Sequence, residues 1–159
     1  MSFSPQSKVW IYQSDRAFTT EEVTAIEQKL AEFTSQWKAH GHQLQAKAEV
    51  LHNFFLVFTV DEASAGVTGC SIDASVRVVK ELEQQYDVDL FNRFNMAYLV
   101  EDNVVVANKE DFETLINIKA VGTKTIVFNN MVQTLADFES KWRVPFEESW
   151  HKQVFAHLL

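Results

Sequence analysis

One segment of the chain is almost entirely apolar: Phe54-Phe55-Leu56-Val57-Phe58-Thr59-Val60. Most of its residues are aromatic or β-branched, which favours a strand, and the lack of alternation with polar residues indicates that both faces are covered. We therefore predict a strand that is central in its sheet. A turn is predicted before it at His52-Asn53, and residues 43–50 alternate between polar and apolar as in a half-exposed strand.

A helix is predicted before this pair of strands and another after it. Thr19 and Glu22 have the T-x-x-E spacing of a capping box, and apolar residues then recur at helical spacing over residues 23–37. Gly41 is predicted to end this first helix, because glycine readily adopts the left-handed conformation found at helix C-termini. Residues 72–86 carry a second apolar stripe of helical period.

The remaining elements are short. They are a strand at 9–12, a hairpin at 97–107, a helix capped by Asn108 and closed by Gly122, a strand at 125–128, a helix capped by Thr134, and a helical tail in which Pro145 occupies the first turn. The first six elements follow the βαββαβ order of a ferredoxin-like unit. We predict one α+β domain over residues 1–159, with a mainly antiparallel sheet covered by helices in two layers and a C-terminal helical extension.

The charge balance excludes several classes of protein. The chain has 14 Lys and Arg against 22 Asp and Glu, a net charge of −8, and it lacks the basic stripe that nucleic-acid binding needs. The longest apolar run, Phe54 to Phe58, is far shorter than the ~20 residues that span a bilayer. A single cysteine and an N-terminus without a secretory pattern favour the cytoplasm.

The scarcity of glycine points to one location. Two of the four glycines, Gly66 and Gly69, flank the predicted start of the second helix beside the only cysteine, Cys70. A helix N-terminus can bind an anion through free backbone N–H groups and can lower the pKa of a thiol. We predict a ligand site formed by Gly66, Thr68, Gly69, Cys70 and Ser71. In the alternative interpretation the glycines serve loop geometry, and Cys70 or Ser71 merely caps the helix while the thiol packs inward.

Two histidines follow the first helix and offer a second kind of chemistry. His40 and His42 could act on Cys70 as a base, which makes these three residues the candidate catalytic group. The same three residues with Asp61 could also ligate zinc. Neither a helical H-x-x-x-H pair nor a C-x-x-C pair is present, so we predict no metal site.

The last predicted helix places Phe146, Trp150 and Val154 on one stripe. This stripe either completes the hydrophobic core or forms the contact of a homodimer. Aromatic residues suit both roles, so the sequence leaves both open.

Four segments together resemble a family of short bacterial proteins that often carry the label ABC transporter ATPase. They are residues 9–16, 39–41, 69–73 and 89–93, and the resemblance spans most of the chain. The label implies ATP hydrolysis, which needs a G-x-x-x-x-G-K-[ST] loop. The nearest sequence here is Gly122-Thr123-Lys124-Thr125, in which Thr123 and Ile118 replace the two glycines, and no L-S-G-G-Q-like signature occurs. We therefore transfer no ATP-binding residues and no cofactor.

These observations lead to three functional hypotheses. The first is a non-enzymatic, cytosolic accessory domain that binds a small polar or anionic ligand or a protein partner, with homodimerisation as an option. The second is a thiol-dependent or metal-assisted enzyme or redox sensor centred on Cys70. The third is the ATPase that the family label implies.

Overall fold

The computed structural model describes residues 3–61 and 68–159. Its first sheet has the order β1-β5-β4 and is antiparallel throughout, with β1 at Lys8–Gln13, β4 at Gln45–Leu51 and β5 at Phe55–Asp61. All seven residues of β5 are buried, so the predicted central strand is confirmed. The turn before it is also confirmed, because His52 and Asn53 both have positive φ and the Phe54 N–H donates to Leu51 O across them.

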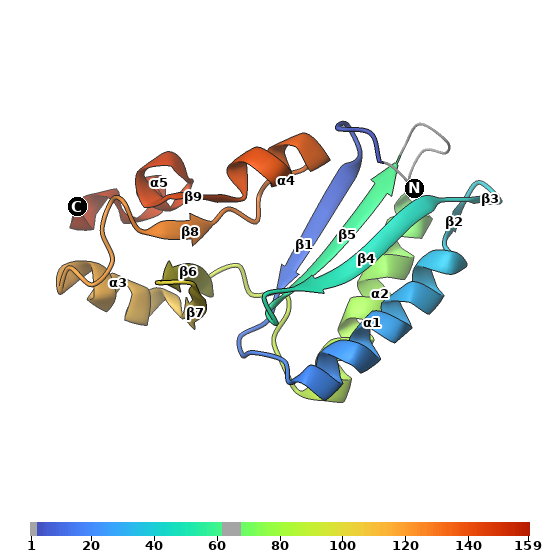
Figure 1. The fold of residues 1–159 in the computed structure, drawn as a ribbon, viewed down its shortest axis with the longest axis horizontal. Helices are drawn as coiled ribbons and strands as arrows, with labels where there is room; N and C mark the ends of the chain where they lie inside the picture. The colour runs from blue at the N-terminus through green and yellow to red at the C-terminus, as the bar shows by residue number, and fades with distance from the viewer. Residues whose placement is uncertain (1–2, 62–67) are drawn as a thin grey trace.

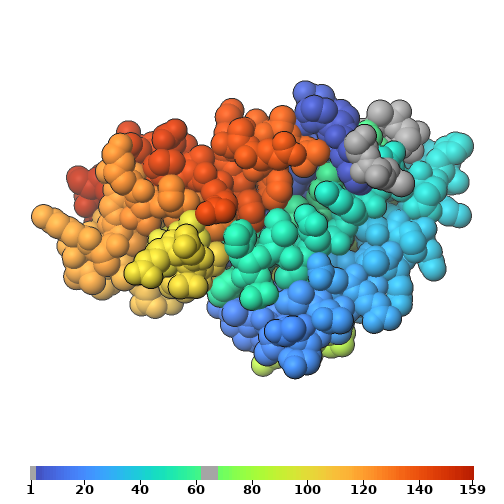
Figure 2. Space-filling model, viewed as in Figure 1, coloured from blue at the N-terminus to red at the C-terminus, as the bar shows by residue number. Residues whose placement is uncertain are grey.

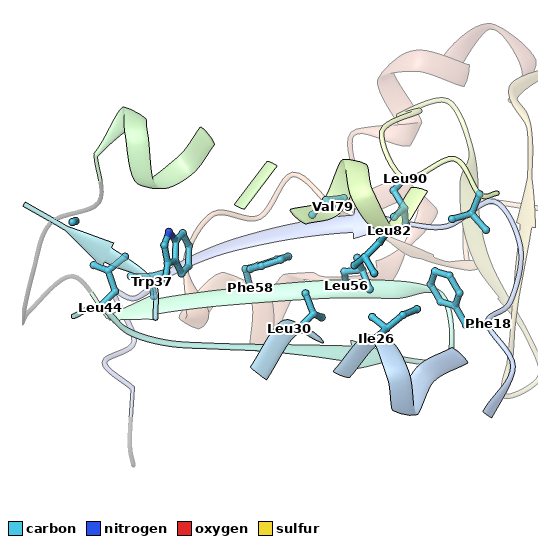
Figure 3. Close-up of a cluster of buried hydrophobic side chains, with 13 residues drawn as sticks. Phe18, Ile26, Leu30, Trp37, Leu44, Leu56, Phe58, Val79, Leu82 and Leu90 are labelled. Atoms are coloured by element: carbon cyan, nitrogen blue, oxygen red, sulfur yellow. The ribbon is translucent and has the colours of Figure 1, made fainter. Parts of the chain in front are cut away.

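Two helices, α1 (Thr20–Ser35) and α2 (Gly69–Tyr86), cover one face of this sheet (Figure 1). The capping box of α1 is present as predicted: the Thr19 side chain accepts from the Glu22 N–H, and the Glu22 carboxylate accepts from the Thr19 N–H. Side chains from the helices and the strands meet in one cluster (Figure 3), and its buried members include Ile26, Leu30, Leu56, Phe58, Val79 and Leu82.

The prediction that the first helix ends at Gly41 is wrong. The helix ends at Ser35, and His40 and Gly41 form the turn of a small hairpin between β2 (Lys38–Ala39) and β3 (His42–Gln43). Both turn residues have positive φ, 53° and 76°, so Gly41 serves a type I′ turn and not a helix end. Trp37 lies beyond the helix but is still buried, and its indole N–H donates to the Ser71 carbonyl of α2 at 2.8 Å.

The second sheet has the order β7-β6-β8-β9 and is antiparallel as well. Its strands are β6 (Met96–Val100), β7 (Asn103–Ala107), β8 (Ile126–Phe128) and β9 (Arg143–Pro145). Residues of α3 (Lys109–Asn117), η1 (Phe146–Glu148), α5 (His151–Phe155) and η2 (Ala156–Leu158) pack against one face of it. Each sheet with its helices is thus a two-layer α+β unit, as predicted.

Three details of this second half differ from prediction. The helix capped by Asn108 ends with Lys119 in the left-handed conformation, φ 64°, so Gly122 does not close it. Pro145 ends strand β9 instead of starting a helix, because its extended backbone pairs with Ile126. Phe146 is fully buried among the residues of α3 and α5, so it belongs to the core and cannot form a homodimer contact.

The ferredoxin-like topology stops after three strands. β1, β4 and β5 have the expected split-βαβ arrangement, but β6 joins the second sheet, where β7 and β8 pair with its two edges. The place beside β1 is partly taken by residues 133–135: the Val9 N–H donates to Gln133 O, and the Leu135 N–H donates to Ser7 O. The fourth strand of a ferredoxin-like sheet therefore does not form.

A third cluster joins the two sheets. It contains Val9, Phe55 and Val57 of the first sheet together with Phe128 and Trp142 of the second half. Thr134 caps α4 (Leu135–Lys141), as predicted, and Leu135 and Phe138 of this helix pack on the same cluster. The space-filling view shows the two halves of the chain meeting along a continuous boundary (Figure 2). In the described part of the chain, no helix has the length and apolarity needed to span a bilayer.

Candidate functional site

At the predicted site at the start of α2, the polar side chains are used largely to cap the helix itself. Thr68 is the N-cap, its hydroxyl accepts from the Ser71 N–H at 3.1 Å, and the Ser71 hydroxyl accepts from the Thr68 N–H at 2.8 Å. Gly69 opens the helix and Cys70 is exposed in its first turn. Gly66 lies outside the described residues. The structure differs from the alternative interpretation in two respects: Thr68, and not Cys70 or Ser71, is the N-cap, with Ser71 completing the capping box, and the Cys70 side chain is exposed and does not pack inward.

The structure does not bring the candidate catalytic group together. His40 and His42 are exposed in and beside the β2–β3 turn. Within residues 3–61 and 68–159, no hydrogen bond or ion pair joins either imidazole to Cys70. The same residues contain no group of three His, Cys, Asp or Glu side chains that could hold a metal ion.

Two connected cavities lie instead beside β1. The first has a volume of about 110 Å³ and is lined by residues of β1, by parts of the segments 90–97 and 128–131, and by Trp150 and His151. The second has a volume of about 450 Å³ and extends along β1 from Lys8 to Tyr12, with Ile72 of α2 and residues 130–133 on its walls. Five residues line both cavities: Ile11, Tyr12, Arg93, Asn130 and Met131. We refer to the two cavities together as the β1 cavity.

The β1 cavity differs in charge from the rest of the molecule. The chain carries 22 Asp and Glu, yet no described Asp or Glu lines either cavity, whereas Lys8 and Arg93 do. Neither cation forms a salt bridge with any described residue, and the side chain of Arg93 donates a hydrogen bond to the sulfur of Met131, at 3.7 Å. Burial raises the pKa of Tyr12, and the nearby charge of Arg93 opposes this effect. The cavity therefore offers positive charge that no carboxylate of the described chain neutralises.

A chain of hydrogen bonds fixes the polar wall. The Trp142 indole N–H donates to Asn130 Oδ1, Asn130 Nδ2 donates to Gln13 Oε1, and Gln13 Nε2 donates to Asn95 O, each at 2.9 Å. Because an indole can only donate, it determines the orientation of the Asn130 amide, which in turn determines that of Gln13. These hydrogen bonds, which start at Trp142, hold the amide side chains of this wall in fixed orientations before any ligand binds.

The opposite wall is aromatic. Trp150 stacks on His151 with ring centroids 3.9 Å apart, and the indole N–H of Trp150 is buried without a hydrogen-bond partner in the described structure. His151 is buried, its Nδ1 lies 2.7 Å from the Ser149 hydroxyl, and burial lowers its pKa to about 4. The imidazole is therefore neutral at pH 7. An unpaired buried donor of this kind costs stability.

The β1 cavity could not be located from the sequence because five distant segments build it. Residues 89–93 are part of the family resemblance, but the resemblance implies no role for Arg93. The helical pattern of the sequence suggests Trp150 only as a core residue or as a homodimer contact. One usable signal exists: Gln13, Asn95 and Asn130 are uncharged amides at the ends of apolar strands, where buried polar groups must find partners.

Comparisons with family models, with curated proteins and with solved structures gave no match for this chain.

Proposed function

We propose that this protein is a binding domain for a small organic anion with an apolar or aromatic body, and that the β1 cavity is its site. The observation that carries this proposal is the charge of the cavity lining: among the described residues Lys8 and Arg93 line the cavity and no Asp or Glu does, in a chain of net charge −8. Such a lining attracts an anion that most of this acidic surface would repel.

The lining residues suit the two parts of such a ligand. The guanidinium of Arg93 matches a carboxylate in geometry and charge, and its lack of an ion pair leaves it available. Tyr12, Phe91 and Trp150 provide aromatic surface for the apolar part. The fixed amides of Gln13 and Asn130 supply directional hydrogen bonds.

Binding is favoured over catalysis by what the lining contains. None of the described residues that line the β1 cavity is Ser, Thr, Cys, Asp or Glu, so the described lining offers no Ser or Thr hydroxyl, no thiol and no carboxyl group as a nucleophile or acid. His151 is held by Ser149 and stacked on Trp150, which are structural contacts. We propose that the domain acts in a reducing cytoplasm, consistent with a single, exposed, unpaired cysteine.

The test uses benzoate as the probe and its neutral isostere benzamide as the matched ligand. The chain has four Trp, which give at most four indole N–H signals in a ¹⁵N-edited NMR spectrum, and the signal missing from Trp150→Phe is that of Trp150. We expect benzoate to shift the Trp150 signal and Arg93→Gln to weaken this binding about tenfold, as loss of a charge-assisted hydrogen bond would.

Arg77→Gln is the matched control, because Arg77 is exposed on α2 and does not line the cavity. The proposal fails if benzamide shifts the Trp150 signal as strongly as benzoate, or if Arg77→Gln weakens binding as much as Arg93→Gln.

A further inference from the structure

The outer edge of β1 is only half covered. Residues 133–135 pair with its beginning, through Val9 N–H to Gln133 O and Leu135 N–H to Ser7 O. An isolated antiparallel bridge between Lys8 and Thr134 marks this contact. Beyond Val9 the covering segment leaves the strand, and the β1 cavity opens along the remaining edge.

The pairing determines which backbone groups face the opening. In a strand, backbone groups of alternate residues point to the same side. Since the Val9 N–H points outward to Gln133, the backbone N–H and C=O of Ile11 also point outward, away from β5. No hydrogen bond in the described structure uses these two groups on that side, and Ile11 lines both parts of the cavity. Such an edge is a template for one more strand.

The open edge and the charge of the cavity point to the same kind of ligand. From Ile11 to Gln13 the strand offers space for about three extended residues, roughly 10 Å. An extended peptide can pair with Ile11, and its terminal carboxylate can meet Arg93, which has no ion pair in the described structure. The 110 Å³ part of the cavity, with Trp150 and Phe128 in its lining, offers space for one apolar side chain.

We propose that the natural ligand of the β1 cavity is the C-terminal end of a peptide or protein, bound as a short added strand. Its last residue is apolar, its free carboxylate pairs with Arg93, and its backbone hydrogen-bonds to Ile11. This inference rests on the proposed function, because it names the class of organic anion that the cavity binds. Strand addition supplies affinity through the backbone, and the cavity supplies specificity through one side chain.

Three peptides test it: acetyl-Ala-Val-Leu with a free carboxylate, the same peptide as its carboxamide, and the free acid with an N-methyl group on the Val nitrogen. We expect the free acid to bind more tightly than benzoate and to slow hydrogen exchange of the Ile11 amide. The carboxamide should bind about tenfold more weakly, and Arg93→Gln should remove that difference. The N-methylated acid should also lose about tenfold, because it cannot donate to the edge.

The inference is overturned if the N-methylated peptide binds as well as its parent, or if the Ile11 amide exchanges equally fast in the free and saturated protein. If benzoate still binds through Arg93 in that case, the proposed function stands and only the peptide class is wrong. If neither benzoate nor the free acid shifts the Trp150 indole signal, both proposals fail. Arg77→Gln again serves as the control variant.

Discussion

Asn130 Nδ2 donates a hydrogen bond to Gln13 Oε1 at 2.9 Å, and this bond connects the segment after β8 to the edge strand of the first sheet. Both amides are held in one orientation, since the Trp142 indole donates to Asn130 Oδ1 and Gln13 Nε2 donates to Asn95 O. A group that cannot donate at position 130 therefore disturbs the packing of the two sheets and the wall of the β1 cavity together.

Asn130→Asp tests this relationship. The carboxylate can still accept from Trp142 but cannot donate to Gln13, and it brings negative charge into a cavity lined by Lys8 and Arg93. We expect the free energy of unfolding to fall by about 1–3 kcal/mol, and benzoate affinity to fall at least about tenfold. Urea denaturation and the NMR titration measure the two effects. Asn103→Asp makes the same charge change at an exposed position and should alter neither.

The cluster between the sheets predicts that the two halves unfold together. Phe55 is fully buried there, with ring centroids 4.8 Å from Phe128 and 5.0 Å from Trp142. Phe55→Ala should lower the free energy of unfolding by about 3–5 kcal/mol, and Phe94→Ala, at a residue that is 57% exposed, by less than about 0.5 kcal/mol.

Wild-type unfolding should show one transition, with coincident curves from Trp fluorescence and circular dichroism. Two separated transitions, with Phe55→Ala affecting only one, would contradict the prediction of a single domain.

The sequence predicts correctly those strands and helix caps that are determined by residues close together in the chain. The buried strand at 55–61, the capping box of Thr19 and Glu22, and the cap at Thr134 follow from hydrophobic pattern and side-chain chemistry within a few residues. The predictions that helices end at Gly41 and Gly122 are wrong for a physical reason. In this chain non-glycine residues such as Asp87 and Lys119 take the left-handed conformation at helix ends, so the position of a glycine does not mark where a helix ends.

The candidate site depends on long-range packing. Its position requires that β6 leaves the first sheet and that residues 133–135 cover only the start of β1, and neither event has a local signal. The sequence pointed to Cys70 because scarce residues gather there, whereas Arg93, Asn130 and Trp150 come together only through the contact between the two halves. The prediction of a ligand site at residues 66–71 stays a prediction.

The start of α2 provides a direct test of that earlier prediction. Thr68→Ala removes the N-cap acceptor for the Ser71 N–H and should lower the free energy of unfolding by about 1 kcal/mol. Cys70→Ser changes an exposed side chain without a hydrogen-bond partner in the described structure, and should change stability by less than about 0.5 kcal/mol. It should also leave benzoate binding unchanged. A loss of binding in Cys70→Ser with unaltered stability would favour the thiol-centred hypothesis.

His151 should make stability depend on pH in a defined window. Burial lowers its pKa from 6.5 to about 4, so between these values the unfolded chain binds a proton that the folded chain does not. The folded protein therefore loses stability relative to the unfolded chain as the pH falls from about 6.5 toward 4, and the total loss caused by His151 is at most about 3 kcal/mol.

Urea denaturation of wild type and His151→Gln at pH 7.5, 6, 5 and 4 measures the effect, because the titration of the carboxylates cancels in the difference between the two proteins. We expect the wild type to lose more stability than the variant on acidification. His157→Gln is the control, since His157 is exposed near the C-terminus and should leave the wild-type pH dependence unaltered. Equal pH dependence in wild type and His151→Gln would show that the imidazole is protonated as readily in the folded chain as in the unfolded one, which its burial beside Trp150 does not allow.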